Sequence, residues 1–207
     1  MKKILWCGDS TVVGRTLRPG SSELIVSDSN EVAVCTDLLK SKHGQDSVIS
    51  VNAGRGGSNI AQWCNGDASQ AIIPFASRMD LAENSDVDIV VLQIGINDSF
   101  NPAIGVNDFM WCLQEIHRIV SKIKGKKIVF CTPCPIDSAA NVKLWSLQFG
   151  MKSVAKTLGV PVVDHYSALL SATANWKPML SDKIHPTDDL YRFKGNTSFV
   201  AISQLFE

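Results

Sequence analysis

Short apolar runs alternate with longer amphipathic segments along the chain. Residues 4–7 and 88–94 are nearly continuous apolar runs, as expected for strands that are covered on both faces. Between the runs, apolar residues recur at three- and four-residue spacing, which is typical of helices with one buried face. The predicted strands are residues 4–7, 47–51, 88–94, 127–131 and 160–163, and the predicted helices are residues 30–42, 58–79 with a break at 65–66, 108–124, 139–158, 167–172 and 189–206.

This alternation predicts an α/β protein with a five-stranded parallel sheet. Strands that are separated by helices pair in parallel through right-handed crossovers, which place helices on both faces of the sheet. Residues 11–29 show little periodicity and are expected to form a loop over the end of the sheet. With 207 residues, of which 45% are hydrophobic, the chain suffices for one core, and we predict a single domain over residues 1–207.

Charge and hydropathy limit the classes of partner that the chain is expected to bind. Twenty basic residues balance twenty acidic ones, and a cluster at 124–127 is explained by a solvated helix end, so nucleic acid is not an expected partner. The first apolar run is too short for a secretory signal peptide. No segment approaches the roughly 18 apolar residues of a membrane span. We expect a cytoplasmic protein without a membrane partner; a phage virion component made in the cytosol would share these features.

The six cysteines lie mostly inside apolar runs, where a free thiol packs as a small hydrophobic group. This favours a reducing compartment. Cys131 and Cys134 have the spacing of a redox motif, but no second pair completes a zinc site. We therefore expect these residues to pack in the core, and we expect no metal and no cofactor.

Polar residues follow the predicted strands at the points where they end. Ser10 closes a Gly-Asp-Ser sequence after the first strand, a glycine-rich block at 52–57 follows the second, and Asn97 follows the third. Asp182 and His185 come after the fifth. Each group has a local explanation, since Ser, Asn, Asp and Gly dominate turns. Together they indicate a functional site, because the carboxyl ends of parallel strands meet at one edge of the sheet, where ligands bind.

The three-residue separation of Asp182 and His185 allows one tight turn to place the carboxylate on one imidazole nitrogen and leave the other free. A serine hydroxyl is a weak nucleophile, and a neutral imidazole must take its proton during attack. Ser10 could supply that hydroxyl. His165, which follows a predicted strand directly, is the alternative base, whereas His117 lies in the middle of a predicted helix.

These motifs resemble the conserved blocks of the SGNH (GDSL-type) hydrolases, and they occur in that family's order. The resemblance implies a three-layer α/β/α sandwich of the flavodoxin-like type and the hydrolysis of esters. The chain has no Gly-x-Ser-x-Gly elbow and no P-loop, so an ordinary α/β-hydrolase or a nucleotide-binding loop is not expected. The blocks are Gly8-Asp9-Ser10, Asn52-Ala53-Gly54-Arg55-Gly56-Gly57, Gly95-Ile96-Asn97-Asp98 and Asp182-Lys183-Ile184-His185.

The resemblance also implies a role for each matching residue. Ser10 is the expected nucleophile, His185 the base and Asp182 its partner. The expected oxyanion hole combines the backbone N–H of Ser10, the backbone N–H of Gly57 and the side chain of Asn97, although a neighbouring glycine could replace Gly57. Fixed donors stabilise the negative charge that develops on the ester oxygen, and glycine lets a backbone N–H approach the substrate closely.

The sequence gives less information about the substrate than about the catalytic residues. Thr11 follows the serine where lipase-like members have leucine, which resembles the carbohydrate acetylesterases more closely. Trp63 and Trp176 could each offer a flat face to a sugar, although packing in a core or under a loop is the commoner role of a tryptophan. Arg15 and Arg55 could hold an anionic substrate, although exposed arginines on loops are usually solvated. We expect a serine esterase that removes short acyl groups, foremost acetyl, from a carbohydrate. The alternatives are a lipid esterase or thioesterase, an acyltransferase and a non-catalytic binding module.

Overall fold

A computed structural model of the chain describes residues 1–206. Five strands form one sheet in the order β4-β1-β5-β6-β7, and every pair of neighbours is parallel. Counted among these five, the order is second, first, third, fourth, fifth, which is the flavodoxin-like order. The predicted α/β fold class is therefore confirmed. The strands are β1 (Lys2–Gly8), β4 (Val48–Asn52), β5 (Ile89–Gln93), β6 (Lys127–Thr132) and β7 (Val162–Asp164).

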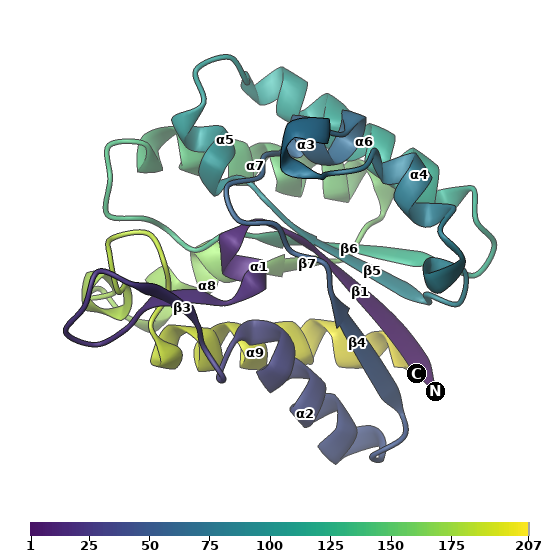
Figure 1. The fold of residues 1–207 in the computed structure, drawn as a ribbon, viewed down its shortest axis with the longest axis horizontal. Helices are drawn as coiled ribbons and strands as arrows, with labels where there is room; N and C mark the ends of the chain where they lie inside the picture. Colours follow the sequence, from purple (N-terminus) through teal and green to yellow (C-terminus); the bar gives the residue numbers. More distant parts are fainter. Residues whose placement is uncertain (207) are drawn as a thin grey trace.

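Helices cover both faces of the sheet, as Figure 1 shows. Two helices lie on one face and four on the other. Smaller helices stand at the carboxyl edge of the strands or in connections. The first face carries α2 (Glu31–His43) and α9 (Asp188–Ser203), the second carries α3 (Ile60–Asn65), α4 (Phe75–Met79), α6 (Val106–Ser121) and α7 (Asn141–Leu158), and the remainder are α1 (Ser10–Val13), α5 (Ile96–Phe100), α8 (His165–Ala172), η1 (Ala68–Gln70), η2 (Ala82–Asn84), η3 (Lys177–Met179) and η4 (Gln204–Phe206).

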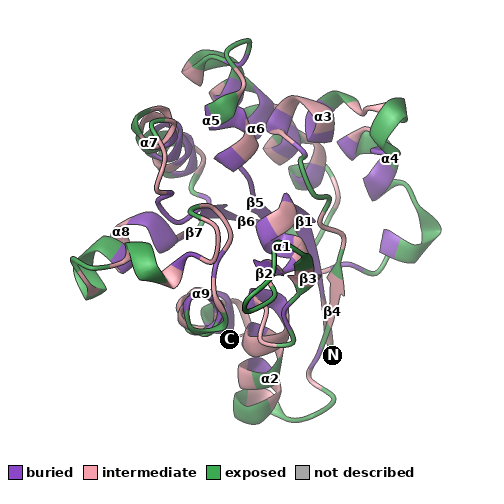
Figure 2. Ribbon diagram, turned by 60° about the vertical axis from the view of Figure 1, so that its left-hand side comes forward, coloured by how far each residue is buried: buried purple, intermediate pink, exposed green. Residues whose placement is uncertain are grey.

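Side chains alternate across the sheet and build two cores. Along β1, Ile4 and Trp6 point into the core under α2 and α9, whereas Leu5 and Cys7 point into the core under α6 and α7. Every residue of β5 is buried, which explains why its sequence is a continuous apolar run. Figure 2 shows the buried residues concentrated on the central strands and on the inward sides of the helices.

The strand register places the ends of β1 and β5 level with each other and the end of β4 two residues before them. Gly8 at the end of β1 pairs with Gln93 at the end of β5, and Trp6 pairs with Asn52 at the end of β4. The chain crosses from one side of β1 to the other between β4 and β5, so this edge is a topological switch point, where open α/β sheets bind ligands. The motifs that follow these strands consequently meet there.

Two sequence-based predictions were wrong in part. Residues 11–29 are not one loop, because they contain α1 and an antiparallel hairpin of β2 (Arg15–Leu17) and β3 (Leu24–Val26). The predicted helix over residues 58–79 is broken into α3, η1 and α4. Gly66 ends α3 with φ of 84°, and Pro74 lies against it. The other boundaries agree with the predictions to within a few residues.

The cysteines that were singled out for redox spacing pack as core residues. Cys131 and Cys134 are both buried, and both are free thiols. Burial raises the pKa of Cys134 to about 12, so its thiol is protonated near neutral pH. Within residues 1–206, no helix combines the length and the apolar character that crossing a bilayer requires.

Candidate active site

The first turn after β1 places Ser10 at the carboxyl edge of the sheet. A Cβ atom on Gly8 would lie 2.0 Å from the carbonyl oxygen of Gln93, so only glycine lets the two strands end this close together. Asp9 then caps α1, because its Oδ1 accepts a hydrogen bond from the backbone N–H of Thr11 at 2.9 Å. Ser10 is the first residue of that helix.

A row of hydrogen bonds joins Ser10 to a turn near the C-terminus. Oγ of Ser10 lies 2.9 Å from Nε2 of His185, and Nδ1 of His185 lies 2.6 Å from Oδ2 of Asp182. The other oxygen of Asp182 accepts from the backbone N–H groups of Ile184 and His185. Burial alone would raise the pKa of Asp182, but these hydrogen bonds from His185 and Ile184 outweigh it and lower the pKa. The carboxylate is therefore charged and fixed against the ring.

The glycine block borders a pocket of about 650 Å³ that opens at Ser10. Gly56 and Gly57 line this pocket, whereas Gly54 packs against α1, where a Cβ would lie 2.8 Å from the backbone nitrogen of Val13. Gly57 has φ of 77°, and within residues 1–206 no atom outside its chain neighbours lies within 4 Å of its Cβ position. Glycine suits this position because of the positive φ, and not because neighbouring atoms would crowd a side chain. The other lining residues are Ser10, Arg15, Leu24, Ile96, Asn97, Phe100, Ile184 and His185.

Asn97 is oriented by a buried serine. Its Nδ2 donates to the carbonyl oxygen of Ser58 at 2.9 Å, which engages one of the two amide hydrogens and leaves the other for a ligand. Oγ of Ser58 accepts from Nε1 of Trp63 and lies within hydrogen-bonding distance of the carbonyl oxygens of Arg55 and Gly8. Ser58 thus ties the end of β1, the glycine block and Asn97 together.

Asp98 connects two further elements at the same edge. Its buried Oδ1 accepts from the backbone N–H of Ile60 at 2.9 Å, which joins the start of α5 to the start of α3. Its Oδ2 has no hydrogen-bond partner among the described residues. Burial raises the pKa of Asp98 to about 7, and the nearby charge of Asp9 adds to the rise. Asp98 therefore changes charge near neutral pH.

The sequence matches one family over most of its length. Residues 7–193 match the model of the GDSL-like Lipase/Acylhydrolase family. The chain belongs to this family. The matched range contains the serine turn, the glycine block, Asn97 and the Asp182 to His185 turn, and a member of this family is a carboxylic ester hydrolase. A search of curated proteins found no match to the sequence.

Solved structures with the same fold include several esterases. An aryl esterase from M. smegmatis has a TM-score of 0.76 and 18% sequence identity, with 99% of this chain and 98% of that chain covered. A carbohydrate acetylesterase from Sinorhizobium meliloti has a TM-score of 0.79 and 15% identity, with 99% and 100% covered. An acetylxylan esterase from Geobacillus stearothermophilus has a TM-score of 0.72 and 18% identity, with 97% and 94% covered. At these identities the likeness shows the fold alone, and the fold is the one that membership of the GDSL-like family implied.

Of the four residues considered for substrate binding in this GDSL-like protein, three do not line the Ser10 pocket. Trp63 is fully buried, and the guanidinium of Arg78 covers its ring at 4.7 Å, so the prediction that Trp63 offers a face to a sugar was wrong. Trp176 is half-buried and borders a separate hollow with Asp137. Arg55 is exposed on the turn that precedes the pocket glycines. Arg15, the fourth, is remote from the glycine block in sequence but lines the pocket.

The alternative histidines are bonded to other partners. His165 is fully buried beneath the sheet edge, where its Nε2 lies 2.8 Å from Oε1 of Glu31. Nε2 of His117 lies 3.0 Å from Oγ of Ser121, one turn further along α6. Although His165 follows the end of a strand, its side chain therefore lies in the core and not at Ser10.

Beneath Ser10 lies a buried polar network that the sequence analysis missed. Glu31 accepts from Nζ of Lys194 at 2.8 Å and from Oγ of Ser198 at 2.6 Å, in addition to its contact with His165. The amide of Gln93 fits between them when its oxygen accepts from Lys194 and its nitrogen donates to Glu31, each at 2.9 Å. Burial would raise the pKa of Glu31, but Lys194 and His165 outweigh it and lower the pKa. Through Gln93, this buried ion pair is connected to Thr11 in the first turn of α1.

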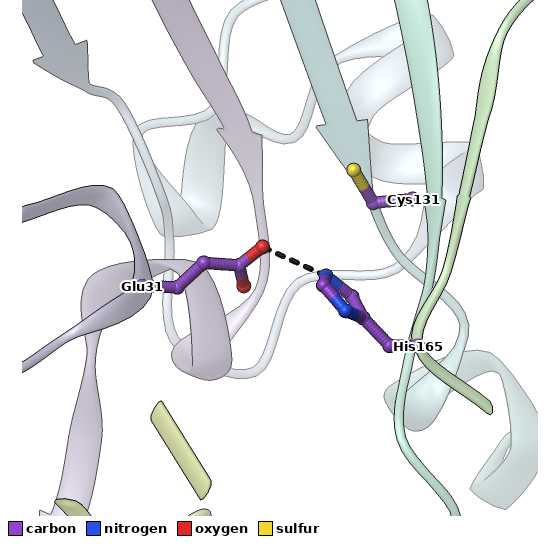
Figure 3. Close-up of side chains that lie close together, drawn as sticks. All are labelled: Glu31, Cys131 and His165. Atoms are coloured by element: carbon purple, nitrogen blue, oxygen red, sulfur yellow. Dashed lines mark hydrogen bonds and ion pairs between the residues drawn. The ribbon is translucent and has the colours of Figure 1, made fainter. Parts of the chain in front are cut away.

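Part of this network has the donor set of a metal site. One oxygen of Glu31, the sulfur of Cys131 and one nitrogen of His165 lie within 4.8 Å of one another, and Figure 3 shows them converging from three elements. The donors do not suit a divalent ion, because Glu31 already binds the ammonium group of Lys194. Burial also raises the pKa of Cys131 well above its usual value, which keeps the thiol protonated. The cluster is better described as an internal ion pair.

Proposed function

We propose that this chain is a serine esterase that removes short acyl groups, foremost acetyl, from a carbohydrate. The observation that carries the proposal is the unbroken row of hydrogen bonds from Asp182 through His185 to Ser10, which ends in an open pocket. A hydroxyl, an imidazole and a carboxylate in this order make up the arrangement that activates serine for attack on an ester carbonyl.

In the proposed reaction, Nε2 of His185 takes the proton of Ser10 while Oγ attacks the carbonyl carbon of the ester. His185 then gives that proton to the leaving alcohol, and an acyl-serine remains. Water attacks this intermediate with the same assistance and releases the acid. Asp182 keeps the proton on Nδ1 of His185 in the resting state and stabilises the imidazolium that forms in each half of the reaction.

The same pocket offers donors for the oxyanion. The backbone N–H of Ser10 lies in the first turn of α1, where a helix has no internal acceptor. The second amide hydrogen of Asn97 and the backbone N–H of Gly57, beside Gly56, complete the proposed hole. Because Ser58 already orients Asn97, this donor would need no rearrangement during the reaction.

The preference for a carbohydrate rests on two observations. First, Thr11 follows the nucleophile where lipase-like members have leucine. Second, the solved structures that share this fold include a carbohydrate acetylesterase and an acetylxylan esterase. A second candidate, a lipid esterase or thioesterase, is favoured by the apolar side chains of Leu24 and Phe100, which line the pocket and are 39% and 47% exposed. Acyl-chain preference separates the two candidates.

The test compares the hydrolysis of p-nitrophenyl acetate with that of p-nitrophenyl octanoate. The proposal predicts the higher kcat/KM for acetate and a loss of about a thousandfold or more in kcat for Ser10→Ala and for His185→Ala. Ser153→Ala on the exposed side of α7 and His117→Ala on α6 are the matched controls and should keep full activity. Preference for octanoate would favour the second candidate. Turnover of neither ester would favour a binding module.

A further inference from the structure

Arg15 is the one permanently charged side chain among the residues that line the Ser10 pocket, in the part of the chain that the structure describes. The lining contains no Asp or Glu within residues 1–206, and His185 must be neutral to act as a base. The pocket therefore presents a positive charge against apolar walls from Leu24, Ile96 and Phe100. Such a charge lowers the free energy of binding of an anion more than that of a neutral ligand.

Within residues 1–206, Arg15 forms no ion pair with a carboxylate, whereas two other arginines of the surface do. Arg18 pairs with Glu23 at 3.1 Å, and Arg192 pairs with Asp189 at 3.0 Å. Within residues 1–206, the guanidinium of Arg15 donates one hydrogen bond, from Nη1 to the carbonyl oxygen of Leu24 at 3.3 Å. A guanidinium has five N–H donors, so most of them remain for a ligand.

Contacts with three neighbouring segments hold the backbone of Arg15 in place and leave its guanidinium largely unoccupied. Oη of Tyr191 donates to the carbonyl oxygen of Arg15 at 2.7 Å, and Arg15 pairs with Val26 across the hairpin. The backbone N–H of Leu17 donates to Oγ of Ser181, which ties the hairpin to the segment that carries Asp182. Because this backbone is fixed, less conformational entropy is lost when the side chain binds a ligand than for an arginine on a mobile loop.

We propose that Arg15 anchors a carboxylate on the alcohol part of the substrate, so that the ester hydrolysed is one of an acidic sugar. The planar guanidinium matches a carboxylate through two parallel hydrogen bonds. A short acyl group has no place for a charge, so the anion belongs to the alcohol. This inference rests on the proposed esterase function and narrows its substrate class.

The test uses two acetyl esters that differ in charge: 4-acetoxybenzoate, which carries a carboxylate, and its neutral methyl ester. The measured quantity is the ratio of kcat/KM for the anionic ester to that for the neutral ester. Comparing this ratio between wild type and variants cancels the intrinsic reactivity of the two esters. Arg118→Gln is the matched control, because Arg118 is exposed on α6 and lies outside the pocket lining.

The ratio should fall about tenfold or more in Arg15→Gln, as expected for the loss of a charge-assisted hydrogen bond, and should stay unchanged in Arg118→Gln. Arg15→Lys keeps the positive charge but loses the planar group that can form two parallel hydrogen bonds, and it should give an intermediate ratio. This variant also serves as a control for misfolding of Arg15→Gln. Added salt should lower the wild-type ratio. An unchanged ratio in Arg15→Gln, or equal falls in the two glutamine variants, would overturn the inference. If the inference were overturned but the neutral ester were still hydrolysed by wild type and not by Ser10→Ala, the esterase proposal would stand.

Discussion

Oγ of Ser10 and Nε2 of His185 lie 2.9 Å apart although 175 positions separate them in the chain. The fold brings them together because β1 ends at the sheet edge where the turn from Asp182 to His185 also lies. The nucleophile turn is capped by Asp9, and the histidine turn is fixed by backbone hydrogen bonds to Asp182. Both halves of the candidate site are therefore ordered before any substrate binds.

Asp182→Asn should lower kcat by about a thousandfold while leaving the fold intact. An amide at this position can donate to Nδ1 of His185, which would place the imidazole proton on Nε2 and remove the acceptor for Ser10. The measurement is kcat on p-nitrophenyl acetate, with Asp137→Asn, on a partly exposed carboxylate paired with Lys177, as the control. Equal, small effects of the two substitutions would show that Asp182 does not orient the base.

Asn97→Ala should lower kcat by roughly a hundredfold or more with little change in KM, because an oxyanion donor acts in the transition state and not on the bound ester. Asn107→Ala on the exposed side of α6 is the matched control. A rise in KM with unchanged kcat would instead assign Asn97 to substrate binding.

Asp98→Asn should change how stability depends on pH. The pKa of Asp98 is raised to about 7 in the folded protein, above its unfolded value, so its contribution to stability is present below the unfolded pKa and is lost as pH rises through 7. The wild type should therefore lose up to roughly 4 kcal/mol between pH 4 and pH 8 from this group, and the amide variant should not. Urea denaturation at several pH values measures this difference. Parallel stability curves for the two proteins would contradict the prediction.

Glu31→Gln should destabilise the protein by about 3 kcal/mol or more, because it leaves the buried ammonium group of Lys194 without its carboxylate. Combining it with Lys194→Met should cost less than the sum of the two single changes, since the pair is then removed together. Urea denaturation gives all three values. Lys177→Met, which breaks an exposed pair with Asp137, is the control and should cost less than about 1 kcal/mol. Additive costs for the buried pair would show that its members are not coupled.

The strands were predictable because buried parallel strands need continuous apolar runs, and the motifs were predictable because they follow those strands. The hairpin of β2 and β3 was not, since three-residue strands are too short to show alternation. Burial of Trp63 could have been found, because Trp63 shares a helical face with the buried Ile60 and Cys64. Lys194 could have been found, because it shares a helical face with the buried Leu190, Tyr191 and Ser198. Its partner Glu31 could not, because only the packing of α2 on α9 joins them.

Labelling with a fluorophosphonate tests the central claim most directly, because the reagent reacts with an activated serine by forming a bond from Oγ to phosphorus and releasing fluoride. We predict one adduct per chain, located on Ser10 by mass spectrometry of the digested protein. Ser10→Ala should take up no label, and His185→Ala should react far more slowly. A labelled residue other than Ser10, or ester hydrolysis that persists in an unlabelled Ser10→Ala protein, would contradict the assignment of Ser10 as the nucleophile.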